Sequence, residues 1–171
     1  MVGLIVVSLS GCVTGESVVV RGYGGRLASL KTIAVVDVIG RLNEPQKVEV
    51  SDFFVMELLK HGFQPLERGQ IQKVVKEIKF QHSGLTRRDA AIETGRMLNT
   101  PAVVVINVPK WGGKSTMTAK IIEVETGAIM FIGEAAGNTG SVASTLAGAA
   151  IGAAAGYGIG DSSSGRRAGT A

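Results

Sequence analysis

Short apolar runs, each long enough to form a strand, recur along much of this chain. Residues 32–38 are nearly all β-branched, which is typical of a strand that is covered on both faces. Residues 102–108 form a second apolar run and predict a central strand. Three further strands are expected at 63–67, 114–124 and 128–133, the last two joined at residues 125–127 as an antiparallel hairpin.

Between these runs the apolar positions follow a helical period. The first predicted helix spans residues 48–61 and ends before Gly62, and its expected apolar stripe is Val48, Phe54, Val55, Leu58 and Leu59. The second has the i, i+3, i+4, i+7 spacing of an amphipathic helix at Ile71, Val74, Val75 and Ile78. Its lysines, Lys73, Lys76 and Lys79, point away from that stripe and predict a solvated face.

A third helix is expected after Thr86, which can act as its N-cap with Asp89 three residues on. Gly95 lies inside this helix, where glycine is about 1 kcal/mol less favourable than alanine, so a close helix–sheet approach is expected there. The order of elements is β-α-β-α-α-β-β-β. It predicts an α/β domain made of a single mixed β-sheet with helices packed on it, followed by a C-terminal Gly/Ala-rich helix.

The composition of the flanking segments sets the predicted domain boundaries. The expected divisions are a signal peptide at 1–11, a flexible tether at 12–30, the α/β domain at 31–138, a glycine-rich helix at 139–160 and a disordered tail at 161–171. Within the tether, residues 18–20 can add a short edge strand.

The start of the chain combines an apolar run, Val2 to Val7, with the small residues Ser10 and Gly11 before the only cysteine, Cys12. This order resembles the lipobox of bacterial lipoproteins, in which the matching cysteine is acylated and a palmitate-type chain inserts in the membrane. The alternative is a buried strand followed by an ordinary buried thiol. Val13 is not acidic, and by resemblance to enterobacterial sorting this favours the periplasmic side of the outer membrane.

The predicted C-terminal helix carries a glycine at every fourth position: Gly148, Gly152, Gly156 and Gly160. On a helix these glycines form one groove, which lets a second helix approach closely. The pattern resembles the glycine zippers of some envelope lipoproteins and marks these residues as an oligomerisation site. The open alternatives are a helix on a partner copy or on its own domain, a membrane-associated helix, and a flexible tail.

Charge and composition argue against several functional classes for this protein. Over 171 residues the formal net charge is +4, which is too small and too scattered to indicate a nucleic-acid partner. His61 and His82 are isolated from other metal ligands, so neither a metal nor a cofactor is expected. Residues 113–116 lack the earlier glycine of a phosphate loop. No catalytic residues are identified, and we predict a protein that is not an enzyme.

One aromatic side chain stands out on a predicted turn. Trp111 follows the central strand and precedes two glycines. It is a candidate for a contact with a partner protein, and a plug over the sheet edge is an equal alternative. Glu67 and Arg68 end a predicted strand, where we expect them to fix that end rather than to perform acid–base chemistry.

Residues 31–133 resemble the soluble domain of CsgG-type lipoproteins, which have a TolB-N-terminal-like fold. The matching features are the opening strand 33–36, Phe63 with Glu67 and Arg68, Glu77, the series Ala91, Gly95 and Leu98, and the hairpin residues Thr126 and Gly127. Residues 111–114 form a short connection in place of a long membrane hairpin, which favours a relative that is not a channel.

The resemblance implies a lipid-anchored periplasmic protein that acts in assembly or export of a surface structure, with homo-oligomers or other envelope proteins as partners. The alternative that it leaves open is a monomeric adaptor that binds and activates an envelope enzyme such as a peptidoglycan synthase.

Overall fold

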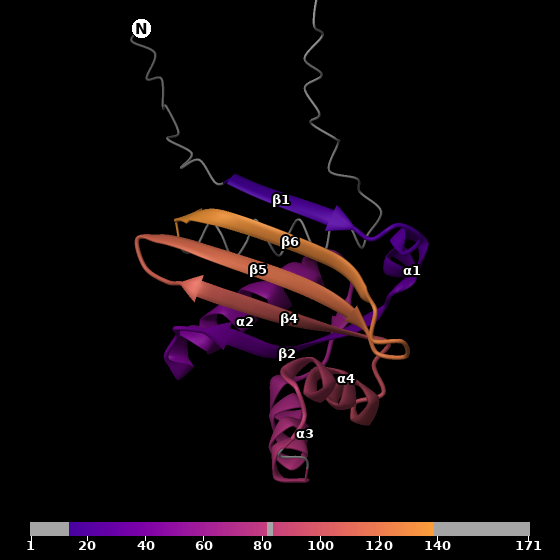
Figure 1. The fold of residues 1–171 in the computed structure, drawn as a ribbon. Helices are drawn as coiled ribbons and strands as arrows, with labels where there is room; N and C mark the ends of the chain where they lie inside the picture. The colour runs from indigo at the N-terminus through magenta and orange to yellow at the C-terminus, as the bar shows by residue number, and fades with distance from the viewer. Residues whose placement is uncertain (1–13, 82–83, 139–171) are drawn as a thin grey trace, which may run out of the picture.

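A single six-stranded sheet forms the frame of the domain (Figure 1). The computed structural model describes residues 14–81 and 84–138. The strand order is β1-β6-β5-β4-β2-β3. The strands are β1 Thr14–Val19, β2 Thr32–Gly40, β3 Gln64–Pro65, β4 Ala102–Lys110, β5 Lys114–Glu123 and β6 Ile129–Asn138. The strands β2, β3 and β4 are parallel, and the other neighbours are antiparallel, so the predicted mixed α/β sheet is confirmed.

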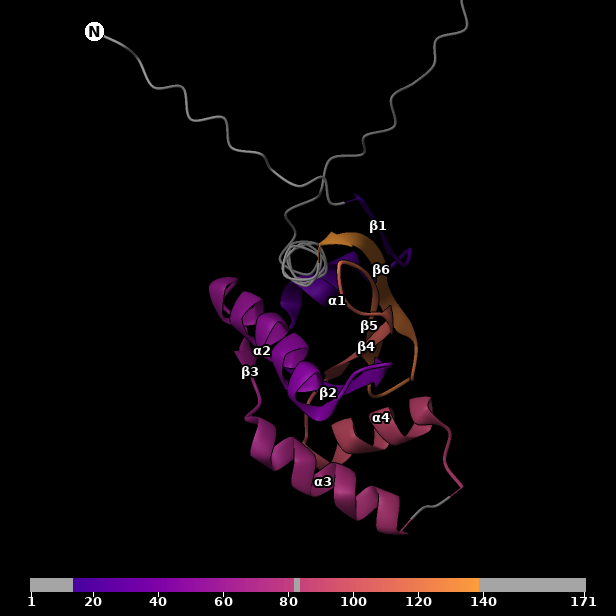
Figure 2. The ribbon, with the colours of Figure 1, turned by 90° about the vertical axis from the view of Figure 1, so that its left-hand side faces the viewer.

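Helices cover the sheet on both faces (Figure 2). On one face lie α1 (Gly24–Ser29) and α2 (Glu44–Lys60), and on the other lie α3 (Arg68–Gln81) and α4 (Arg87–Met97). The second pair lies against β2 and β4 and leaves much of that face of β5, β6 and β1 without a helix.

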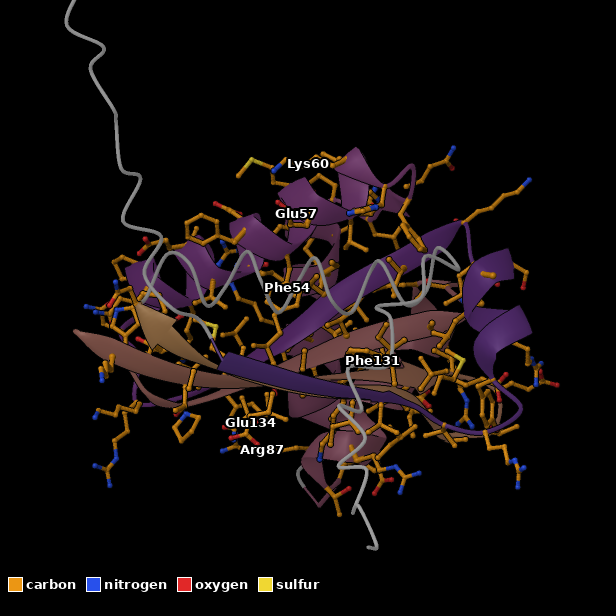
Figure 3. The ribbon with its side chains drawn as sticks, turned by 90° about the horizontal axis from the view of Figure 1, so that it is seen from above. Phe54, Glu57, Lys60, Arg87, Phe131 and Glu134 are labelled. Carbon is orange, nitrogen blue, oxygen red and sulfur yellow. The ribbon has the colours of Figure 1, made fainter. Side chains whose placement is uncertain are left out.

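The larger core lies between the sheet and α2 (Figure 3). Phe54 from α2 and Phe131 from β6 are 1% and 0% exposed and point into this layer. A smaller core on the opposite face joins α4 to the sheet through Ala91, Val103, Ile122 and Val124. Glu57 and Lys60 form an ion pair on the outer side of α2, with 2.6 Å between Lys60 Nζ and Glu57 Oε1. In this pair the Lys60 side chain is 58% exposed and the Glu57 side chain is 14% exposed.

Helix α2 begins earlier than its apolar pattern predicts, at Glu44. The side chain of Asn43 accepts a hydrogen bond from the backbone N–H of Gln46, whose side chain accepts one from Asn43 in return. This capping box satisfies the first turn, where Pro45 fits because its missing N–H is not needed. At the other end Gly62 has φ +81°, which confirms it as the helix-ending residue.

The buried stripe of α2 differs from the prediction. The helix buries Val50, Phe54 and Leu58 at four-residue intervals, whereas Leu59 is 59% exposed. The expected stripe combined this row with Val55 and Leu59, which lie one position further along the chain. Both rows are apolar, and the angle at which the helix packs on the sheet decides which of them is buried.

Helix α4 approaches the sheet closely at Gly95, as predicted. A Cβ atom at Gly95 would lie 2.4 Å from Val124 Cγ2 and 2.8 Å from Val103 Cγ1. Glycine therefore lets the helix backbone rest directly on two strand side chains. The N-cap at Thr86 is also confirmed, since its side chain accepts a hydrogen bond from Asp89 N.

The expected tether at 12–30 requires a correction over its described part. Strand β1 pairs with β6 over six residues, and α1 follows it with Leu27 fully buried. Residues 14–29 thus belong to the domain. The pairing also explains why β6 continues to Asn138 rather than ending at 133, because β1 satisfies its outer hydrogen-bonding groups.

Candidate functional site

Most of the predicted site residues fall outside the described ranges. Cys12 lies there, together with the divisions 1–11, 139–160 and 161–171 and the groove glycines Gly148, Gly152, Gly156 and Gly160. The acylation site and the oligomerisation site therefore stay predictions.

Trp111 lies in the connection between β4 and β5. Its side chain is half-buried and packs against the larger core. This packing favours the interpretation of Trp111 as a plug over the sheet edge. Its role in a contact with a partner stays a prediction.

The glycines after Trp111 make the tight turn into β5. Gly112 and Gly113 have φ values of +102° and +57°, and Gly112 N donates to Ser115 Oγ at 3.2 Å. The segment that follows this turn is the strand β5, as the sequence predicts, whereas the glycines of a phosphate loop lead into a helix.

Three exposed cations gather at the end of the sheet where β4 turns into β5. Lys110 ends β4, Lys114 begins β5, and Arg41 directly follows Gly40, the last residue of β2. We call Arg41, Lys110 and Lys114 the basic end. None of them forms an ion pair with another described residue. The first residue of β1 and the last residue of β6 lie at the same end of the sheet, as Figure 1 shows.

The opposite end of the sheet holds a buried carboxylate, which is fully paired. Glu123 is 5% exposed, and Arg26 Nη1 lies 2.8 Å from its Oε1. Thr126 donates its hydroxyl hydrogen to the other carboxylate oxygen. These contacts hold α1 against the turn between β5 and β6, so Glu123 acts as a structural tie. Sequence analysis missed this pair because nearly a hundred residues separate its members.

A cleft of about 770 Å³ lies between β2, α3 and α4. Its walls combine apolar side chains, with Val36, Val75 and Ile78 among them, and the charged residues Asp37, Lys47 and Arg87. The hydroxyl of Thr94 in this cleft donates to the carbonyl of Ala90 at 2.7 Å, so it is engaged within its own helix. Among the described residues of the lining there is neither His nor Cys.

Glu67 caps helix α3 rather than ending the strand expected at 63–67, because β3 already ends at Pro65. Its carboxylate accepts a hydrogen bond from Gln70 N at 3.1 Å. Hydrogen bonds from the backbone N–H groups of Gly69 and Gln70, together with the charge of Lys73, lower the pKa of Glu67 below its ordinary value of 4.5. Arg68 extends from the same cap toward Asp52, with 3.9 Å between the charged atoms.

This cap predicts a pH-dependent contribution to stability. Because the folded-state pKa of Glu67 is lowered, its contribution is present above pH 4.5 and is lost as the pH falls through the folded-state pKa. We expect the melting temperature of the parent protein to fall more steeply below pH 4.5 than that of Glu67→Gln. Thermal melts followed by circular dichroism between neutral and acidic pH measure this difference. Parallel pH profiles would contradict the capping role.

The described residues contain neither a cluster of metal ligands nor a membrane-spanning helix. Within residues 14–81 and 84–138, no three His, Cys, Asp or Glu side chains gather closely enough to hold a metal ion. In the same part of the chain, no helix combines the length and apolar character needed to cross a membrane.

Comparison with known proteins connects this fold to a family. Residues 38–115 match the family model described as curli production assembly/transport component CsgG. The resemblance to CsgG-type proteins is confirmed. The match runs from the last three residues of β2 to the start of β5, and it includes α4 with its close approach at Gly95. A comparison with curated protein sequences gives no match.

Solved structures share the CsgG-like fold. The PelC dodecamer from Paraburkholderia phytofirmans is 17% identical with a TM-score of 0.56, over 84% of this chain and 97% of that one. Lipoprotein GNA1162 from Neisseria meningitidis is 14% identical with a TM-score of 0.50, over 65% of this chain and 83% of that one. The C-terminal domain of LpoB from Escherichia coli is 15% identical with a TM-score of 0.49, over 69% and 94%. At these identities the first two show a common fold.

Proposed function

We propose that this chain is a lipid-anchored periplasmic protein of the bacterial outer membrane that acts in assembly or export of a surface structure through self-association. The observation that carries this proposal is the match of residues 38–115 to the model of an assembly/transport component. The likeness of the whole domain to a subunit of the PelC dodecamer supports self-association.

The proposed anchor is Cys12, and the described fold suits it. Strand β1 begins at Thr14, two residues after Cys12, and it is hydrogen-bonded to β6 from its first residue. Two residues span at most about 7 Å. An acylated Cys12 would therefore hold the folded domain close to the membrane surface.

The proposed self-association site is the groove of Gly148, Gly152, Gly156 and Gly160. Small residues at four-residue spacing let two helix backbones approach closely, which is the geometry of a glycine zipper. The tail begins after Asn138, at the same end of the sheet as β1.

The proposal does not include catalysis. The most buried carboxylate of the described domain, Glu123, is tied to Arg26 and Thr126, and the Thr94 hydroxyl of the cleft is engaged by a carbonyl. These groups act in folding. We therefore assign the domain an adaptor or scaffold role rather than turnover of a substrate.

The solution mass tests the proposed self-association. Light scattering should compare the full chain carrying Cys12→Ser with the same chain carrying Gly152→Leu and Gly156→Leu. The matched control carries Ala150→Leu and Ala154→Leu, which lie off the glycine groove. We expect a discrete high-mass species for the parent and the control, and a lower mass for the glycine variant, because leucine side chains fill the groove.

A monomer in all three proteins would contradict self-association. It would favour the alternative function, a monomeric adaptor that activates an envelope enzyme such as a peptidoglycan synthase. Equal loss of mass in the glycine variant and in the control would contradict the assignment of the groove.

A further inference from the structure

We propose that the basic end, formed by Arg41, Lys110 and Lys114, binds the anionic headgroups of the membrane that holds the anchor. This inference rests on the proposed anchoring at Cys12. It adds a second contact, made by the folded domain itself, and it fixes which end of the sheet faces the lipid.

The pairing register brings the three cations together. Lys110 pairs with Thr116, and Lys114 pairs with Asn138, the last residue of β6. Arg41 follows Gly40, which pairs with Val108 near the end of β4. The end of the sheet therefore brings Arg41, which is distant in sequence, beside the two lysines that flank the turn between β4 and β5.

The same register places the start of β1 at this end. Thr14 pairs with Ala136, two residues before the end of β6. Cys12 is two residues from Thr14 and so lies within about 7 Å of it along the chain. An anchor at Cys12 thus brings this end of the sheet to the membrane surface, whereas the other end lies a full strand length away.

The ion pairs of the two ends also differ. At the opposite end, Arg26 is paired with Glu123 and lies 3.6 Å from a carboxylate oxygen of Glu125, while the exposed Lys31 precedes the first residue of β2.

Acidic residues also lie toward the basic end. Glu44 pairs with Lys47 at 2.6 Å, and Glu16 lies opposite Glu134 in the register of β1 and β6. The three cations of the basic end form no ion pair with another described residue and so stay available to an external anion.

The chemistry of the expected ligand follows from this arrangement. Exposed Lys and Arg side chains near an anionic lipid surface each strengthen binding about five-fold. Screening confines this attraction to roughly 10 Å, which is within reach of an end held by the anchor. Trp111 packs on the core between Lys110 and the turn, which keeps these cations on a fixed support.

The test measures vesicle binding with the anchor removed. The full chain carrying Cys12→Ser is sedimented with vesicles of phosphatidylethanolamine and phosphatidylglycerol, and with vesicles of phosphatidylcholine alone. The test variant adds Arg41→Gln, Lys110→Gln and Lys114→Gln. The matched control adds Arg21→Gln, Lys31→Gln and Lys76→Gln, which remove the same charge from exposed positions elsewhere.

We expect the test variant to bind anionic vesicles about 100-fold more weakly than the parent, and the control to bind like the parent. Added inorganic phosphate should compete no better than chloride at the same ionic strength, which distinguishes a lipid surface from a site for free phosphate. Equal loss in the two variants, or equal binding to both kinds of vesicle, would overturn the proposal. If the test variant bound vesicles like the parent but had a lower solution mass, the basic end would be a contact with a second copy of the chain, and the proposal would be overturned.

Two further measurements keep the outcomes separate. Thermal melts should show that the test variant folds like the parent, because its three positions are exposed. Labelling with a fatty-acid analogue in cells tests the anchor directly and should be lost in Cys12→Ser. If Cys12→Ser loses the label and still prefers anionic vesicles to phosphatidylcholine vesicles, both proposals are supported. If Cys12→Ser keeps the label, the anchor is contradicted, whatever the result of the vesicle experiment.

Discussion

Replacement of Phe54 by alanine is expected to lower the free energy of unfolding by about 3–5 kcal/mol. Phe54 is 1% exposed and lies near the middle of α2, where its ring fills the layer between this helix and the sheet. Truncation leaves a cavity that the rigid sheet cannot close. Because domains of this size are stabilised by only about 5–15 kcal/mol, this loss is a large part of the total.

Chemical denaturation followed by circular dichroism measures this loss, with Leu59→Ala as the matched control. Leu59 lies on the same helix but is 59% exposed, so its truncation should change stability by no more than about 0.5 kcal/mol. A comparable cost for the two variants would mean that Leu59 packs against the domain as Phe54 does, as the predicted stripe of α2 has it.

Replacement of Gly95 by alanine is also expected to destabilise the domain, by about 1–3 kcal/mol. Alanine is the better helix former by about 1 kcal/mol, which acts in the opposite direction. The steric term is larger here, because the new Cβ would lie 2.4 Å from Val124 Cγ2 and 2.8 Å from Val103 Cγ1. Neither branched side chain has a flexible end that can move aside.

A double-mutant cycle with Val124→Ala tests the cause. Val124→Ala removes the closer methyl group, so the two changes together should be less destabilising than the sum of the single changes. Gly25→Ala in α1 is the matched control, since a Cβ at that position meets nothing within 4 Å, and it should not destabilise the domain. Additive costs in the cycle would show that the close approach of α4 to the sheet is not the source of the effect.

Several features of the fold follow from local sequence. The β-branched run of β2 and the apolar run of β4 could be recognised because each strand is covered on both faces. Helix α3 was predictable because its apolar positions are clear: Ile71 and Ile78 are buried, as its spacing indicates. The close approach at Gly95 was predictable because an interior glycine in a helix needs a structural reason.

Other features depend on contacts between distant segments. Strand β1 has a polar, glycine-containing start and becomes a strand only because β6 provides its partner. The choice of stripe in α2 depends on how this helix crosses the sheet. The basic end is only partly visible in the sequence: Lys110 and Lys114 flank the short connection at 111–113, whereas Arg41 joins them only through the pairing of β2 with β4.

The pairing of β1 with β6 has a consequence for the biogenesis of this protein. The first strand of the domain binds the last one, and the two are separated by nearly the whole domain. During synthesis or translocation from the N-terminus, β1 emerges first and has no sheet partner until residues 131–136 follow. Closing so long a loop is a slow, late step in folding. Strand β1 is therefore expected to remain open to chaperones and proteases until β6 is available to pair with it.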